Sequence, residues 1–111
     1  MKTVLVVGRD WKFRALLRAQ LREEGFEALG FEGLAEAAAE IASSAPPPAA
    51  LIFDTGEAPP AELAQLPALA EKFLLLVVAS AGELLTIPET HILRRPVQLH
   101  QLVAALASRV R

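Results

Sequence analysis

Short apolar runs alternate with segments of helical periodicity along the whole chain, and this alternation restricts the fold more than any other feature. Each run is rich in aliphatic or aromatic side chains and is bounded by glycine, proline or polar residues, a pattern typical of buried strands. Strands joined by helical crossovers form a parallel sheet with right-handed connections. The sequence therefore predicts an α/β fold, a single domain over residues 1–111, with five strands at residues 3–7, 26–31, 51–54, 73–78 and 90–93.

The segments between the runs predict helices of unequal length. Asp10 is placed to cap the first helix and Gly25 to end it. Pro67 lies inside the third helix, so we expect a kink or a break there. Residues 81–89 contain a glycine and a proline and can hold little more than a turn or two. Apolar residues recur at helical spacing in residues 13–21, 34–42, 61–71 and 99–110.

The composition excludes several classes of function. With no cysteine the chain has neither disulfide bonds nor thiolate metal ligands, and a formal net charge of −2 does not favour binding to nucleic acid. No apolar run is long enough to span a bilayer or to form the core of a signal peptide, so we expect a cytoplasmic protein with no membrane segment. Neither His91 nor His100 is obviously placed beside a nucleophile, which argues against an autonomous enzyme.

The polar residue at the end of the third strand is the leading candidate for a functional site. Asp54 is one of only two aspartates in the chain, and it follows an apolar run at the edge of the sheet where α/β proteins build their sites. Thr55 and Gly56 continue this strand into a loop closed by two prolines. The alternative is that Asp54 only caps the next turn.

Three arginines of the first predicted helix form a separate feature. Arg14, Arg18 and Arg22 recur at intervals of four residues, which places three like charges on one ridge of the helix. They form either a solvated face partly balanced by Glu23 and Glu24 or a docking ridge for an acidic partner. Of the two, a solvated face is the commoner outcome.

The order of these motifs resembles the receiver domain of two-component response regulators. The resemblance covers the whole chain and rests on Val4-Leu5-Val6-Val7, Leu17, Leu21, Gly25-Phe26, Leu51-Ile52-Phe53-Asp54 and Leu93-Arg94-Arg95-Pro96. It implies a flavodoxin-like sheet in the order 2-1-3-4-5, a phosphoacceptor aspartate after the third strand and two carboxylates after the first that help to hold Mg²⁺. It also implies a hydroxyl residue after the fourth strand, an aromatic switch residue in the fifth, and a lysine before a proline.

Matched residue by residue, the resemblance preserves only part of that pocket. Asp54 matches the phosphoacceptor, but Gly8 and Arg9 fall on the acidic pair, so both metal-binding carboxylates are replaced. Asp10 lies one position too late, where it caps the following helix or, after a slip in register, supplies a ligand. We therefore expect no complete metal site, weak or lost Mg²⁺ binding, and no other cofactor.

The other half of the pocket also departs from the family. The hydroxyl position falls on Ala79 or Ser80, and the sequence does not decide between them. Arg95 matches the lysine and keeps Pro96 behind it, in a step that receivers often hold in the cis form, whereas the aromatic switch position falls on Ile92. The chain is shorter than usual on both sides of the fourth strand. The third and fourth helices should therefore be short, and the usual partner surface should differ.

The charges of this pocket predict a direct ion pair in place of a metal. An arginine about 5 Å from Mg²⁺ would repel it by roughly 6 kcal/mol at an effective dielectric constant of about 20. A guanidinium, by contrast, fits a carboxylate in a fork and keeps its proton. We therefore expect Arg9 and Asp54 to lie together at the carboxyl edge of the sheet, with Arg9 or Arg95 paired to Asp54.

Three functions are compatible with these predictions. The favoured one is a stand-alone atypical receiver without an effector domain, which acts by protein contact and without Mg²⁺-dependent phosphorylation. Its partner would be a histidine kinase, a downstream signalling protein or a second copy of the chain. The first alternative is a working receiver phosphorylated on Asp54 by a histidine kinase. The second is a small-ligand-binding module, which has little support because no glycine-rich phosphate loop follows any strand.

Overall fold

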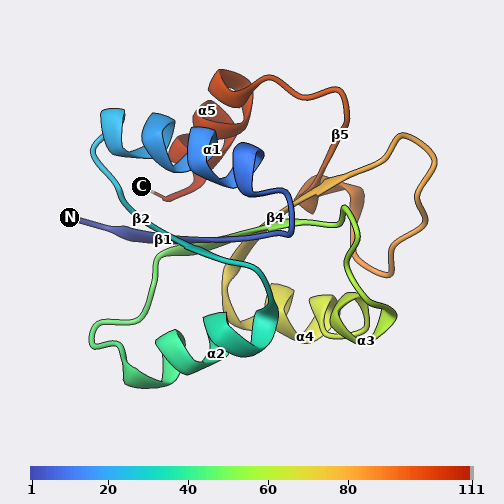
Figure 1. Ribbon diagram of the computed structural model, residues 1–111, viewed down its shortest axis with the longest axis horizontal. Helices are drawn as coiled ribbons and strands as arrows, with labels where there is room; N and C mark the ends of the chain where they lie inside the picture. Colours follow the sequence, from blue (N-terminus) through green and yellow to red (C-terminus); the bar gives the residue numbers. More distant parts are fainter. Residues whose placement is uncertain (111) are drawn as a thin grey trace.

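Residues 1–110 are described by the computed structural model, in which the chain folds into three layers with a parallel sheet in the middle (Figure 1). The strand order is β2-β1-β3-β4-β5, and every neighbouring pair is parallel. This flavodoxin-like order confirms the predicted five-stranded sheet. The strands are β1 (Thr3–Val7), β2 (Glu27–Phe31), β3 (Ala50–Asp54), β4 (Leu74–Ala79) and β5 (Ile92–Arg94).

Helices cover both faces of the sheet (Figure 1). One face carries α1 (Trp11–Glu23) and α5 (Leu99–Val110), and the other carries α2 (Leu34–Ser43), α3 (Pro60–Leu63) and α4 (Leu66–Lys72). Asp10 caps α1 as predicted, because its Oδ1 accepts the backbone N–H groups of Lys12 at 3.1 Å and Phe13 at 3.2 Å. Gly25 follows the end of this helix with a φ of 92°, a conformation that glycine adopts without strain. No helix in residues 1–110 is long and apolar enough to cross a membrane.

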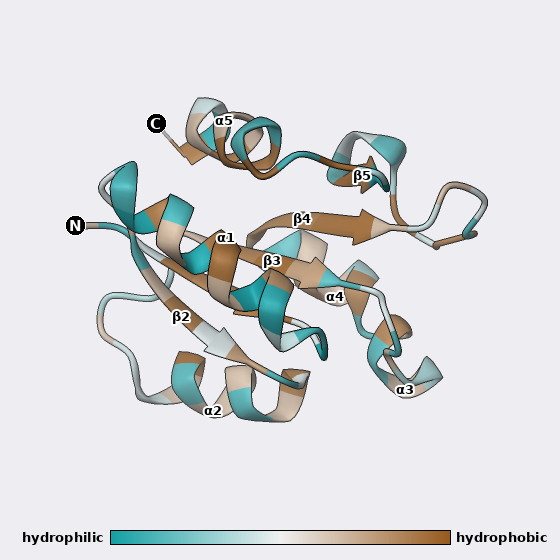
Figure 2. Ribbon diagram, turned by 45° about the horizontal axis from the view of Figure 1, so that its top comes forward, coloured by the Kyte–Doolittle hydropathy of each residue, from teal (hydrophilic) through white to brown (hydrophobic). Residues whose placement is uncertain are grey.

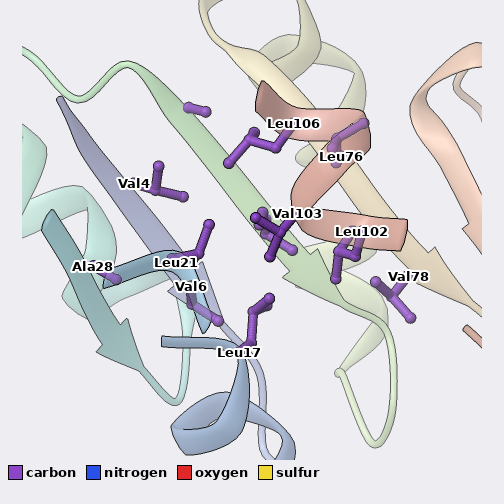
Figure 3. Close-up of a cluster of buried hydrophobic side chains, with 12 residues drawn as sticks. Val4, Val6, Leu17, Leu21, Ala28, Leu76, Val78, Leu102, Val103 and Leu106 are labelled. Carbon is purple, nitrogen blue, oxygen red and sulfur yellow. The ribbon is translucent and has the colours of Figure 1, made fainter. Parts of the chain in front are cut away.

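Two apolar cores lie on opposite faces of the sheet. One packs against α1 and α5, the other against α2 and α4. Figure 3 shows the first core, in which side chains from helices and strands interdigitate: Val4, Val6, Leu17, Leu21, Leu76, Leu102, Val103 and Leu106 are all at most 3% exposed. β1, β3 and β4 are covered on both faces and are apolar except for Thr3 at the start of β1 and Asp54 at the end of β3. β3 and β4 form the hydrophobic centre of Figure 2.

The crossovers on either side of β4 are shortened, as predicted. The third helix is broken after one turn into α3 and α4, with Pro67 in the first turn of α4, where its missing N–H removes no hydrogen bond. Between β4 and β5 the shortening goes further than expected. Within residues 80–91 the only helical piece is the single 3-10 turn η1 (Glu89–His91), and β5 accordingly begins two residues later than predicted.

Candidate functional site

The carboxyl edge of the sheet brings together residues from three separate strands. Asp54 ends β3, Gly8 follows β1 and Arg95 follows β5. Two backbone hydrogen bonds extend the ladder past the strand ends, from Thr55 to the carbonyl of Val78 at 3.0 Å and from Arg95 to the carbonyl of Ala79 at 2.8 Å. Asp54, Gly8 and Arg95 therefore lie together at the edge where the parallel strands end, the kind of place where α/β proteins build their sites.

Arg95 is the cation that meets Asp54. The Asp54 residue is only 5% exposed, and its Oδ1 accepts the N–H of Gly56 at 3.1 Å and a charged hydrogen bond from Nη2 of Arg95. Nη1 of Arg95 also donates to the hydroxyl of Ser80 at 3.2 Å. The Arg95–Pro96 peptide bond is cis. Arg95, one of the two predicted partners, is therefore the residue that pairs with Asp54.

Arg9 lies at the same edge of the sheet but pairs with a different carboxylate. Its guanidinium forms a two-pronged ion pair with Glu62 of α3, with 2.8 Å between Nη2 and Oε2. Oε2 of Glu62 also accepts the N–H of Leu34 at 3.1 Å and so caps α2, whose N-cap residue Gly33 has no side chain. Arg9 is therefore not the partner of Asp54, and of the two predicted alternatives only Arg95 forms the pair. No signal in the sequence pointed to Glu62, which lies 53 positions away along the chain.

The Arg9–Glu62 pair predicts how the stability of the protein depends on pH. The hydrogen bond from Arg9 holds the pKa of Glu62 below its usual value, with the N–H of Leu34 acting in the same direction and burial opposing both. A carboxylate with a lowered folded pKa stabilises the protein fully above its unfolded pKa of about 4.3. The stabilisation is lost as the pH falls through the folded pKa. Glu62→Gln should therefore lower the free energy of unfolding by about 1–2 kcal/mol at neutral pH.

The same substitution should flatten the fall in stability below about pH 4. Urea denaturation across this pH range measures both effects. Glu71→Gln, at an exposed glutamate of α4, is the matched control and should retain the acid-dependent fall. Equal pH profiles for the two variants would show that the Arg9–Glu62 pair does not contribute to stability.

Gly8 is required because Asp54 occupies the space beside it. A Cβ atom at position 8 would lie 2.9 Å from the Cβ of Asp54, a distance at which one of the two must shift, and 3.4 Å from its Oδ2. The N–H of Gly8 donates to the carbonyl of Phe31 at 3.0 Å, and its own carbonyl accepts from Arg14, so the backbone is held on both sides. At position 8, where the resemblance implies an acidic residue, the space for a Cβ atom is therefore already occupied by the side chain of Asp54.

The hydroxyl next to Arg95 belongs to Ser80. Ala79 is fully buried in the core under α2 and α4, whereas Ser80 is exposed and accepts the hydrogen bond from Arg95. Ile92, at the predicted switch position, is half-buried against the same core as Ala79. No aromatic ring occupies this position of β5.

A second network, which sequence reasoning missed, holds the loop after β4. The buried Thr55 donates its hydroxyl to Oε1 of Glu83 at 2.7 Å, and the same oxygen accepts the N–H of Ser80 at 3.1 Å. Arg94 donates to the carbonyl of Ser80 at 2.9 Å and to the carbonyl of Glu83, and it pairs with Glu89. These contacts connect the loop after β4 to residues that follow β3 and to β5.

Two carboxylates line the cavity at this edge of the sheet, and one oxygen of each already accepts hydrogen bonds. Of its two carboxylates, Asp10 uses Oδ1 to cap α1 and Asp54 uses Oδ1 to bind Arg95. No group of three or more histidine, cysteine or acidic residues within residues 1–110 is arranged to hold a metal. The cavity has a volume of about 470 Å³ and is lined by Asp10, Phe13, Asp54, Val78, Arg95, Pro96 and Val97.

The sheet order and the helices on both faces define a flavodoxin-like α/β protein. No protein-family model and no curated protein sequence matches the chain. Solved structures do match over its whole length. The N-terminal domain of the lantibiotic response regulator NsrR, a nisin resistance regulator, has a TM-score of 0.74 and 15% identity over 100% of this chain and 99% of that one.

Two further solved structures also match the fold of this chain over almost its whole length. A response regulator receiver protein from Burkholderia phymatum has a TM-score of 0.74 and 18% identity over 99% of this chain and 95% of its own. The receiver domain of NtrC4, solved as a beryllofluoride-activated dimer, has a TM-score of 0.75 and 20% identity over 97% and 95%. The chain thus has the receiver fold of two-component response regulators, and at these identities the likeness establishes the fold alone.

Proposed function

We propose that this chain is a receiver-type signalling module that acts by contact with a protein partner and without Mg²⁺-dependent phosphorylation of Asp54. The observation that carries the proposal is the ion pair between Asp54 and Arg95. It satisfies the negative charge that a working receiver would offer to a metal and a phosphoryl group. Gly8 and Arg9 contribute no carboxylate on the other side of the pocket.

Electrostatics support this proposal. Transfer of a phosphoryl group to an aspartate adds negative charge that metal ions and positioned cations must stabilise. In this pocket the cation that contacts Asp54, Arg95, already binds the carboxylate that would be the nucleophile, and that carboxylate is almost completely buried. Both groups would have to separate before either could serve in phosphoryl transfer.

The contacts around the loop after β4 support a single signalling state. The hydroxyl of Thr55 and the backbone N–H of Ser80 both donate to Oε1 of Glu83, and the hydroxyl of Ser80 accepts from Arg95. Neither hydroxyl can therefore move towards Asp54 without breaking hydrogen bonds. A partner would accordingly recognise a surface that does not change between signalling states. We also infer a non-enzymatic module, because Nδ1 of the half-buried His91 lies 3.0 Å from the carbonyl of Leu75 and is occupied by that backbone contact.

A titration with Mg²⁺ followed by acetyl phosphate tests the proposal in one sample. We expect no change in thermal stability or in the emission of Trp11, the single tryptophan, which is 65% exposed beside Asp10 at the cavity. Intact-mass spectrometry should show no added phosphoryl group. Covalent phosphorylation that disappears in an Asp54→Asn variant would overturn the proposal and identify a working phosphoacceptor.

The cavity itself favours a second candidate function. Its volume of about 470 Å³ lies within the range of small-molecule sites, and four of its seven lining residues are apolar. A small ligand bound there would contact Phe13, Val97 and the Asp54–Arg95 pair. Nuclear magnetic resonance screening with a fragment library would distinguish this function, because specific ligands would shift the amide signals of the lining residues together.

A further inference from the structure

The free edge of the sheet at β2 is covered by arginine side chains from α1. The strand order leaves one side of β2 without a neighbouring strand. The N–H of Glu27 donates to Lys2 at 2.9 Å, and the carbonyl of Phe31 accepts from Gly8 at 3.0 Å, so both residues direct their backbone groups towards β1. Because backbone direction alternates along a strand, Ala28 and Gly30 direct theirs to the open side.

Two arginines bind the outward carbonyl of Ala28. Nε of Arg18 and Nη2 of Arg22 each donate to this oxygen at 3.2 Å. The hydrocarbon stems of Arg18 and Arg14 also cover the strand, because a Cβ atom at Gly30 would lie 2.9 Å from Cδ of Arg18 and 3.2 Å from Cγ and Cδ of Arg14. The arginine ridge is therefore neither a plain solvated face nor a free docking surface. It is laid across an edge strand.

The sequence of β2 makes its open edge complementary to itself. If two copies paired in antiparallel orientation about Leu29, Ala28 of each copy would face Gly30 of the other. Both residues direct their N–H and C=O groups outward, so the two strands could exchange hydrogen bonds. An unprotected edge of this kind is a template for pairing with another chain.

We propose that Arg14, Arg18 and Arg22 guard the edge of β2 and prevent a second copy of the chain from adding its own β2 there. They act in two ways. Arg18 and Arg22 bind the carbonyl that the incoming strand would use. In the antiparallel pair both α1 helices would lie on the same face of the joined sheet, so the two ridges of positive charge would also repel each other.

The double variant Arg18→Ala/Arg22→Ala tests this proposal by sedimentation equilibrium. The parent protein is expected to remain monomeric up to millimolar concentration, and the double variant is expected to shift to the mass of a dimer as concentration rises. Lys12→Ala/Arg109→Ala is the control with the same change in charge, because both residues are exposed and lie away from β2. This control should remain monomeric.

Adding Gly30→Pro to the double variant tests whether association uses the strand edge. The N–H of Gly30 points outward, so proline removes no hydrogen bond of the sheet but blocks an incoming strand, and the triple variant should return to a monomer. A dimer that persists in the triple variant would overturn the proposal. If the alanine variant does not fold, Arg18→Met/Arg22→Met keeps unbranched stems without charge or donors. This variant should dimerise. A folded methionine variant that stays monomeric would refute the proposal that these arginines prevent pairing at the edge of β2.

Discussion

Replacement of Arg95 by alanine should lower the free energy of unfolding by about 2 kcal/mol, because it leaves the buried carboxylate of Asp54 without its cation. Removing one partner of a fully buried pair costs about 3–5 kcal/mol. The expected loss is smaller here because the Arg95 side chain is 34% exposed and its pair is partly screened by water. The remaining hydrogen bond to Asp54, from the N–H of Gly56, carries no compensating charge. Urea denaturation measures the loss.

A double-mutant cycle isolates the pair from the other contacts of Arg95. Asp54→Ala is introduced into the parent and into Arg95→Ala, and we expect a coupling energy of at least about 1 kcal/mol. Arg95→Lys keeps the charge but not the planar fork, so it should recover only part of the loss. Arg109→Ala removes one exposed arginine and should change stability by less than about 0.5 kcal/mol. A coupling energy near zero would mean that Arg95 does not serve as a built-in cation for Asp54.

Gly8→Asp should destabilise the protein by about 3 kcal/mol in the presence of a chelator. The new Cβ would overlap the Cβ of Asp54 at 2.9 Å, and overpacking of this kind costs about 1–3 kcal/mol. The new carboxylate would also place a like charge beside a buried one, which adds an electrostatic cost. This substitution restores an acidic residue at a position where the receiver resemblance implies one, and thermal and urea denaturation report its effect.

Gly8→Ala separates the steric cost from the charge. It should destabilise the protein by less than Gly8→Asp, because it adds the Cβ without the carboxylate. Millimolar Mg²⁺ should restore part of the lost stability to Gly8→Asp, whose two carboxylates can share a cation, and none to Gly8→Ala. If Gly8→Asp is as stable as the parent protein without Mg²⁺, the pocket has room for an acidic side chain, and the steric account of Gly8 is refuted.

Local patterns in the sequence were sufficient to predict the architecture. Apolar runs separated by helical periodicity predict the parallel sheet, and the N-cap at Asp10, the glycine after α1 and the break near Pro67 each depend on residues within one or two turns of the chain. The placement of Asp54 at the carboxyl edge follows in the same way, because a strand end determines the position of its last residue. Each of these features is caused by residues that lie close together in one short segment of the chain.

Only the tertiary structure decided how the arginines are used. Arg9 and Arg95 stand at the same edge of the sheet, and the choice between them depends on Glu62, which reaches Arg9 from a helix 53 positions away. Likewise, Arg18 and Arg22 bind Ala28 only because α1 packs over an edge strand. A guanidinium sits at the end of a long, flexible side chain with donors in several directions. Its partner is therefore determined by whichever acceptor the fold brings within reach, and spacing along the sequence does not specify that acceptor.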